Sequence, residues 1–229
     1  MNIDPDHPST WFPVRRPHMI AHDVGRSRDR STAVVGGLSL FQRDLLGIAE
    51  LNELPQGLFG SARANELAAV DARYGRNAVI IADLSYDPTY AQVLHETFGR
   101  RVIGLQICKS GDGSTFERRP VGHSAMLVYN VGRSYLLELL LARLQERSFL
   151  MAHDPMSRRA YEQLMALETE MRESGTIYKC PSGQHDDLGM SCAMLAWAAW
   201  HPHLEMWART VAPVRPRPKA QQYGWGAFV

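Results

Sequence analysis

The feature that most constrains the fold is an uninterrupted apolar run, Asn77–Asp83, which is followed by a helix and a second apolar run. The run reads Asn-Ala-Val-Ile-Ile-Ala-Asp, and continuous β-branched runs of this kind are typical of strands covered on both faces. Pro88 precedes a predicted helix at Thr89–Phe98, Gly99 ends it, and Arg101–Ile107 is the next strand. A strand–helix–strand unit of this length implies parallel pairing. We therefore predict a parallel α/β core.

The remaining elements extend this core into a mixed sheet. Three apolar segments close together in sequence predict an antiparallel meander: Met19–Asp23, Thr32–Leu40 and Leu45–Leu54. A hairpin is predicted around Gly122, from Phe116–Val121 and Ala125–Val131. Apolar spacing predicts helices at Ala62–Tyr74, Arg133–Arg147, Ser157–Glu173 and Asp187–Trp200. The expected fold class is α/β, a mixed sheet of antiparallel meander plus parallel strands, flanked by helices on both faces.

Proline-rich segments at both ends suggest the domain limits. Residues 1–18 hold four prolines and are predicted to be an extended leader. Residues 19–200 form the predicted domain, a size that can bury a sizeable core. Residues 201–229 combine prolines with Arg215, Arg217 and Lys219 and are predicted to be a tail.

Composition excludes several classes of protein. Three cysteines without a Cys-x-x-Cys pair suggest neither disulfides nor a zinc knuckle, and favour a reducing compartment. The longest apolar stretch, Leu188–Trp200, has 13 residues, whereas a bilayer span needs roughly 20. We therefore expect a cytoplasmic protein with no membrane partner. The formal net charge of +1 means that a nucleic-acid site would have to be a local patch.

Aspartates stand where the predicted strands end and where the last helix begins. Asp23 and Asp83 end strands, and Asp186 and Asp187 precede an apolar helix. Such positions face the crevice where α/β sheets hold ligands. Carboxylates that converge there repel one another unless a divalent cation neutralises them, and oxygen donors suit Mg²⁺ or Mn²⁺. Two such ions can activate a water and stabilise the leaving oxygen of a phosphodiester.

Each aspartate also has a purely structural alternative. An aspartate shortly before a glycine can simply begin a turn, and this is the structural alternative for Asp23. Asp83 or Asp87 can organise the turn before Pro88. Asp186 or Asp187 can cap the helix N-terminus. Only the joint placement of the four favours a metal site.

Three motifs resemble the nuclease domains of phage and viral terminase large subunits, which belong to the RNase H-like superfamily. The first is His-Asp-Val-Gly-Arg-Ser-Arg-Asp-Arg-Ser-Thr-Ala-Val-Val at 22–35, and the second is Val-Ile-Ile-Ala-Asp at 79–83 with the helix and strand after it. The third, His-Asp-Asp-Leu-Gly-Met-Ser-Cys-Ala-Met-Leu-Ala-Trp-Ala at 185–198, is the most specific. The resemblance covers about residues 19–200.

The resemblance implies a metal-dependent endonuclease that cuts concatemeric viral DNA during packaging, in the cytoplasm of a bacterial host. Asp23, Asp83, Asp187 and Asp186 would be its catalytic metal ligands, with Asp29 as a secondary ligand. Implied partners are double-stranded DNA, a terminase ATPase domain, the small terminase subunit and the portal. The sequence departs from full-length large subunits because none of its three lysines follows a glycine, so it contains no P-loop. The ATPase motor would then act from elsewhere, in cis or in trans.

Basic residues near these motifs are the candidates for DNA contacts. Arg26, Arg28 and Arg30 follow Asp23, while Lys109, Arg118 and Arg119 lie in and after the loop that follows Arg101–Ile107. They can neutralise phosphates, although solvated loops are the structural alternative. No base-reading motif is present, so sequence specificity should be low. Two other functions remain open: another RNase H-like nuclease of resolvase or transposase type, and a non-catalytic module that docks to DNA or a motor.

Overall fold

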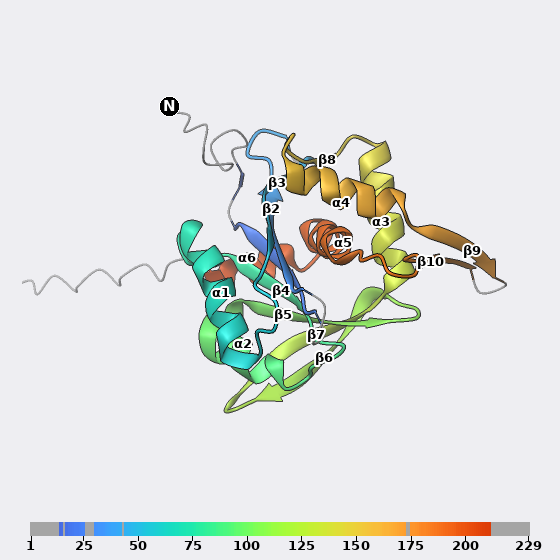
Figure 1. The fold of residues 1–229 in the computed structure, drawn as a ribbon. Helices are drawn as coiled ribbons and strands as arrows, with labels where there is room; N and C mark the ends of the chain where they lie inside the picture. The colour runs from blue at the N-terminus through green and yellow to red at the C-terminus, as the bar shows by residue number, and fades with distance from the viewer. Residues whose placement is uncertain (1–13, 16, 26–29, 43, 173–174, 212–229) are drawn as a thin grey trace, which may run out of the picture.

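The computed structural model describes residues 14–15, 17–25, 30–42, 44–172 and 175–211 (Figure 1). Its main sheet has eight strands in the order β6-β7-β5-β4-β1-β2-β3-β8. These strands are β1 (Met19–Asp23), β2 (Thr32–Leu38), β3 (Leu46–Glu53), β4 (Val79–Asp83), β5 (Val102–Cys108), β6 (Asp112–Val121), β7 (Ser124–Gly132) and β8 (Phe149–Leu150). The helices are α1 (Gly60–Arg73), α2 (Tyr90–Phe98), the 3-10 turn η2 (Gly99–Arg101), α3 (Arg133–Gln145), α4 (Pro155–Met165), α5 (Asp187–Trp200) and α6 (Leu204–Val211).

The pairing of the strands confirms the predicted mixed sheet. β1, β2 and β3 form the antiparallel meander, and β6 with β7 forms the predicted hairpin. β4 pairs in parallel with β1 on one side and with β5 on the other. Because parallel neighbours run in the same direction, β1, β4 and β5 all end at one edge of the sheet. That edge carries two of the four aspartates.

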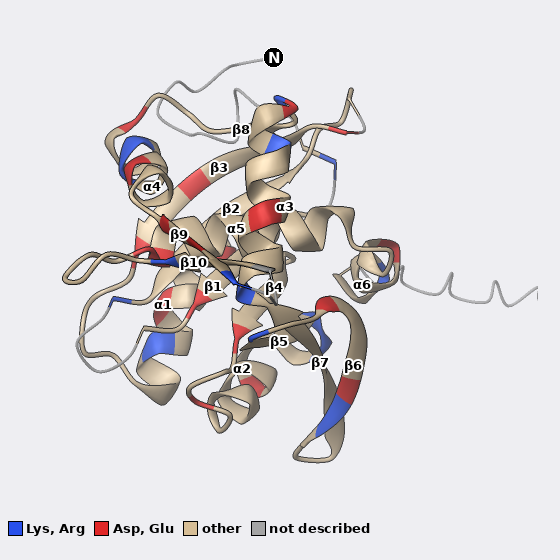
Figure 2. Cartoon of the chain, turned by 90° about the vertical axis from the view of Figure 1, so that its right-hand side faces the viewer, with Lys and Arg blue, Asp and Glu red and all other residues tan. Residues whose placement is uncertain are grey.

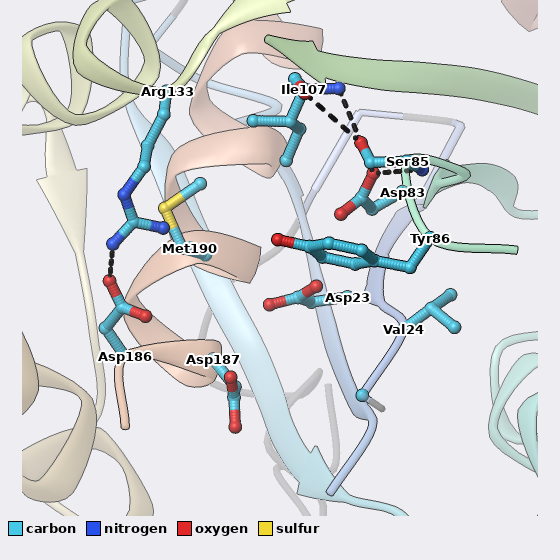
Figure 3. Close-up of a pocket in the computed structure, with 11 residues that line it drawn as sticks. Asp23, Val24, Asp83, Ser85, Tyr86, Ile107, Arg133, Asp186, Asp187 and Met190 are labelled. Carbon is cyan, nitrogen blue, oxygen red and sulfur yellow. Dashed lines mark hydrogen bonds and ion pairs between the residues drawn. The ribbon is translucent and has the colours of Figure 1, made fainter. Parts of the chain in front are cut away.

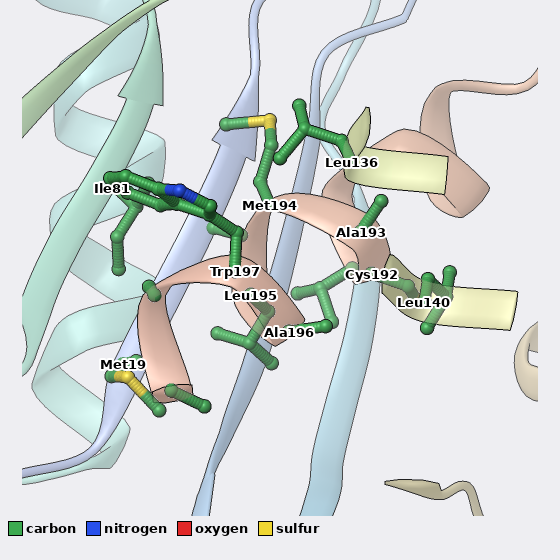
Figure 4. Close-up of a cluster of buried hydrophobic side chains, with 14 of the residues drawn as sticks. Met19, Ile81, Leu136, Leu140, Cys192, Ala193, Met194, Leu195, Ala196 and Trp197 are labelled. Atoms are coloured by element: carbon green, nitrogen blue, oxygen red, sulfur yellow. The ribbon is translucent and has the colours of Figure 1, made fainter. Parts of the chain in front are cut away.

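Helices cover both faces of the sheet, as predicted. Side chains of α1 and α2 pack on one face, while those of α3, α4, α5 and α6 pack on the other. Figure 4 shows α5 directly against the strands, with Leu195 and Trp197 beside Met19 and Ile81. Gly36 of β2 has no room for a side chain, because an added Cβ would lie 2.6 Å from the Gly47 carbonyl oxygen of β3 and 2.8 Å from Leu195 Cδ2 of α5. Among the described helices, none combines the length and the apolarity needed to cross a bilayer.

Two predictions for the C-terminal part were wrong. The helix predicted at Ser157–Glu173 ends at Met165, and β9 (Glu168–Arg172) pairs with β10 (Gly175–Lys179) as a separate hairpin. Met171, expected on the buried face of that helix, is 81% exposed on β9. The predicted tail also contains α6, whose Trp207 is 1% exposed. The packed domain therefore extends past residue 200 to Val211.

Candidate metal centre

Four aspartates from three separate segments line one cavity of about 300 Å³. Figure 3 shows Asp23 and Asp83 on the sheet side of the cavity and Asp186 and Asp187 at the start of α5. The remaining lining residues are Val24, Gly25, Ser85, Tyr86, Ile107, Arg133 and Met190. The structure thus brings together the four principal carboxylates that the sequence suggested.

The parallel pairing of β1 with β4 places Asp23 next to Asp83. His22 stands opposite Ala82 in this pairing, so the following residue of each strand is an aspartate. Asp83 is 3% exposed, and its Oδ1 accepts a hydrogen bond from Ser85 Oγ at 2.5 Å and another from the Ser85 backbone N–H at 2.9 Å. Ser85 Oγ in turn accepts from the Ile107 N–H at 2.7 Å. Ser85 therefore fixes the Asp83 carboxylate and ties the ends of β4 and β5 together.

A hydroxyl of β2 holds the start of α5 beside Asp23. Thr32 pairs with Asp23 across the β1–β2 ladder. Its Oγ1 lies 3.2 Å from the Asp187 carbonyl oxygen and 2.6 Å from Ser191 Oγ, at a site where Thr32 and Ser191 are buried. These contacts bring the pair Asp186–Asp187 next to the strand that carries Asp23, although the pair is more than 160 residues away in the sequence.

The side chain of Asp186 does not cap the N-terminus of α5, so the structural alternative fails for this residue. Asp186 is the N-cap residue by position, but its side chain makes no cap hydrogen bond. Gln163 of α4 takes that role instead, because its Oε1 accepts from the N–H groups of Leu188 and Gly189 at 3.1 and 3.2 Å. A side chain of the neighbouring helix thus accepts from the backbone N–H groups that would otherwise bond to a capping carboxylate.

The crowding of carboxylates has an electrostatic cost. Burial raises the pKa of Asp23 well above its ordinary value, and the charges of Asp83, Asp187 and Asp186 raise it further, while Arg133 opposes the rise. Burial also raises the pKa of Asp83, and the hydrogen bonds from Ser85 partly offset that effect. A divalent cation would remove both penalties, because its charge favours the ionised carboxylates.

The carboxylates of Asp186 and Asp187 have different partners. Asp186 forms an ion pair with Arg133, and Asp187 Oδ2 lies 3.9 Å from His185 Nδ1. Among the described residues, no three His, Cys, Asp or Glu side chains are arranged as a ready-made metal site. The donor chemistry fits a hard divalent cation, but the carboxylates of the α5 pair would have to turn toward Asp23 and Asp83 to enclose it.

Three lining residues with polar side chains were not predicted from the sequence. Arg133 is the first residue of α3, Ser85 follows β4, and Tyr86, 60% exposed, lies at the mouth of the cavity. Ser85 had a local signal, since a serine two residues after an aspartate is a common turn partner. Arg133 had none, because only the tertiary fold brings the start of α3 to this edge.

The predicted DNA-binding residues are scattered relative to the cavity. Arg30 pairs with Glu53 at 2.8 Å and borders a neighbouring hollow that Asp187 also lines. Lys109 is exposed directly after β5, close to the lining residue Ile107. Arg118 and Arg119 lie along β6, where Figure 2 shows basic and acidic segments side by side, and Arg119 pairs with Glu117 at 2.9 Å.

The register shows how far β6 is from the acidic edge. Arg118 stands opposite Leu127 of β7, which stands opposite Ile103 of β5, and Ile103 in turn stands opposite Ile81. Arg118 is therefore three strands from β4 and two residues short of the level of Asp83. Three further predicted site residues, Arg26, Arg28 and Asp29, lie outside the described residues.

The histidine beside Asp23 is a structural residue. His22 is fully buried and bonds through Nδ1 to the Thr32 carbonyl at 2.8 Å. Burial lowers the pKa of His22 to about 4. It is therefore neutral near pH 7, and it does not line the cavity that holds the four aspartates.

Comparison with solved structures identifies the fold. The chain is similar to the large terminase nuclease from thermophilic phage G20c, with a TM-score of 0.57 and 20% identity over 85% of this chain and 83% of that one. The same nuclease with bound magnesium gives a TM-score of 0.54 at 20% identity, covering 80% and 82%. The large terminase nuclease domain of Thermus phage P74-26 gives 0.52 at 19% identity, covering 86% and 82%. No protein-family model matches the sequence, and no curated protein matches it. The chain has the fold of large terminase nuclease domains.

Proposed function

We propose that this chain is a metal-dependent DNA endonuclease, the nuclease domain of a phage large terminase that cuts concatemeric viral DNA during genome packaging. The observation that carries the proposal is the convergence of Asp23, Asp83, Asp186 and Asp187 in one cavity. The fold shared with the nucleases of phages G20c and P74-26 supports it. Because a shared fold alone does not establish chemistry, the carboxylates carry the greater weight.

The proposed cofactor is Mg²⁺ or Mn²⁺, with two ions bound. The G20c nuclease has been crystallised with magnesium, and the four aspartates of the cavity offer oxygen donors of the kind these ions prefer. Asp23, Asp83 and one or both of Asp186 and Asp187 would hold the ions, and Asp29 is a further proposed ligand. When bound, such ions activate a water and stabilise the leaving oxygen of a phosphodiester.

The residues of the chain itself have distinct tasks in this proposal. Ser85 holds Asp83 in one orientation through two hydrogen bonds, and preorganised ligands bind metal more tightly. Gln163 accepts from the N–H groups at the start of α5, a role that a capping carboxylate would otherwise take. Asp83 is 3% exposed, which limits the competition of bulk water for its oxygens.

The proposed substrate is double-stranded DNA, bound without sequence preference. Lys109 and Arg30 are proposed phosphate contacts near the cavity, and Arg118 and Arg119 are proposed as more distant contacts. Arg26 and Arg28, which lie outside the described residues, are proposed as further phosphate contacts. A terminase ATPase domain, the small terminase subunit and the portal are the proposed partners, in the cytoplasm of a bacterial host.

A plasmid cleavage assay tests the proposal. Supercoiled plasmid is incubated with Mn²⁺, Mg²⁺ or EDTA and with wild type, Asp83→Ala or Asp187→Ala. The control is Asp87→Ala, since Asp87 lies outside the cavity and accepts hydrogen bonds from Thr89 Oγ1 and the Tyr90 N–H in a turn. We expect nicking and linearisation with either metal, none in EDTA, loss in both cavity variants and retention in the control. A folded wild type that binds DNA but never cuts it would refute the proposal.

A further inference from the structure

Arg133 is the one basic side chain that lines the acidic cavity among the residues the structure describes. Its guanidinium forms an ion pair with Asp186, and its side chain is 35% exposed. Figure 3 shows the guanidinium reaching from α3 across to the start of α5.

The backbone fixes the point from which Arg133 enters the cavity. Gly132 ends β7 and is the N-cap residue of α3. Its N–H donates to the Gly111 carbonyl at 2.7 Å, and an added Cβ at Gly132 would lie 3.0 Å from the same oxygen. The loop after β5 therefore packs closely against the end of β7, and a side chain at Gly132 would fit only if the loop shifted. Leu136 and Leu137 anchor the following turn in the core, so Arg133 extends from a rigid element.

The ion pair between Arg133 and Asp186 has a clear role in the metal-free protein. Four carboxylates share the cavity, and one guanidinium offsets part of their repulsion. A divalent cation bound by these carboxylates would itself offset their repulsion. The ion pair between Arg133 and Asp186 would then be weaker. Arginine presents a planar fork of donors that matches two oxygens of a phosphate. A phosphodiester placed at the carboxylates would lie in the cavity that this guanidinium also lines.

We propose that Arg133 binds the phosphodiester that is cut, exchanging its ion pair with Asp186 for the phosphate oxygens. This inference rests on the proposed nuclease function. In the hydrolysis, the oxygen of a water forms a bond to phosphorus, one P–O ester bond breaks, and the leaving oxygen takes up a proton. Negative charge gathers on the non-bridging oxygens during the attack, and a guanidinium within reach of them stabilises that charge.

Binding measurements separate this role from a purely structural one. The variants are Arg133→Gln and Arg133→Lys. The matched control is Arg143→Gln, from an arginine of the same helix that pairs with Glu146 away from the cavity. A short fluorescent duplex is titrated with each protein in Ca²⁺ at several salt concentrations, and Mn²⁺ is titrated calorimetrically without DNA.

The expected results differ between the variants. Arg133→Gln weakens DNA binding about 10–100-fold and lowers the slope of log affinity against log salt by about 1. Its Mn²⁺ affinity equals or exceeds that of wild type, because Asp186 loses a competing partner. Arg133→Lys restores the salt slope without the full affinity, since lysine keeps the charge but not the fork. The control matches wild type in both titrations.

Two outcomes would overturn the inference while leaving the nuclease proposal intact. Unchanged DNA affinity and salt slope in Arg133→Gln, with a wild type that cuts plasmid, would mean that Arg133 does not touch the substrate. A loss of Mn²⁺ affinity in that variant would mean that Arg133 positions Asp186 as a ligand. A wild type that neither binds Mn²⁺ nor cuts DNA would instead remove the proposed function, and this inference with it.

Discussion

Replacing Ser85 by alanine should weaken metal binding while leaving the fold intact. The hydroxyl donates to the buried Asp83 carboxylate at 2.5 Å and accepts from the Ile107 N–H at 2.7 Å. Losing a hydrogen bond to a charged group costs about 1.5–3 kcal/mol. At about 2–4 °C per kcal/mol for a domain of this size, the melting temperature should fall by about 3–12 °C. Loss of a residue that orients a ligand should also reduce Mn²⁺ affinity about 10–100-fold.

Calorimetric Mn²⁺ titration together with thermal unfolding measures both effects. Ser157→Ala is the matched control, because Ser157 Oγ donates to Asp154 Oδ2 at 2.7 Å and its N–H bonds to the same side chain, far from the four aspartates. The control should lose a similar amount of stability and no Mn²⁺ affinity. If Ser85→Ala binds Mn²⁺ as wild type does, then Ser85 does not position a metal ligand, and the assignment of Asp83 is in doubt.

Three further predictions follow from the same structure. Metal-free Asp23→Asn should unfold at higher urea than wild type at pH 7, because the raised pKa of Asp23 means that its ionised form destabilises the fold. This gain in stability should shrink as the pH falls toward 3.8, the ordinary pKa of the aspartate side chain. Excess Mn²⁺ should reverse it. A variant less stable than metal-free wild type at pH 7 would contradict the raised pKa of Asp23. Trp207→Ala should lower the free energy of unfolding, measured in urea, by about 3–5 kcal/mol. A loss as small as that of a surface substitution would mean that α6 is not part of the domain. In duplex titrations, Lys109→Ala should lower the salt slope more than Arg118→Ala does, and the opposite order would place the DNA along β6.

Much of the fold could be predicted because its strongest signals are local. The run at Asn77–Asp83 has the composition of a strand buried on both faces, and β4 is buried along its whole length. The apolar helix predicted at Asp187–Trp200 has the same bounds as α5, since its buried surface extends all round. The four aspartates could be grouped because strand ends and helix starts meet at the edge of an α/β sheet.

The features that sequence reasoning missed depend on tertiary contacts. No glycine or proline marks the end of α4 at Met165, so the apolar spacing through Leu167 and Met171 continued to predict a helix. α6 follows Pro202 in a proline-rich segment and is stabilised by the packing of Trp207 against the core. Arg133 reaches the cavity only because the end of β7 meets the loop after β5, a contact between residues distant in sequence.

The location of bound metal tests the central claim most directly. Crystals of the chain soaked in Mn²⁺, measured at a wavelength where manganese scatters anomalously, would reveal each ion by its own density. We expect peaks within coordination distance of carboxylate oxygens of Asp23 and Asp83, and of at least one of Asp186 and Asp187. Manganese bound only at surface carboxylates, with the cavity free of anomalous density, would contradict it.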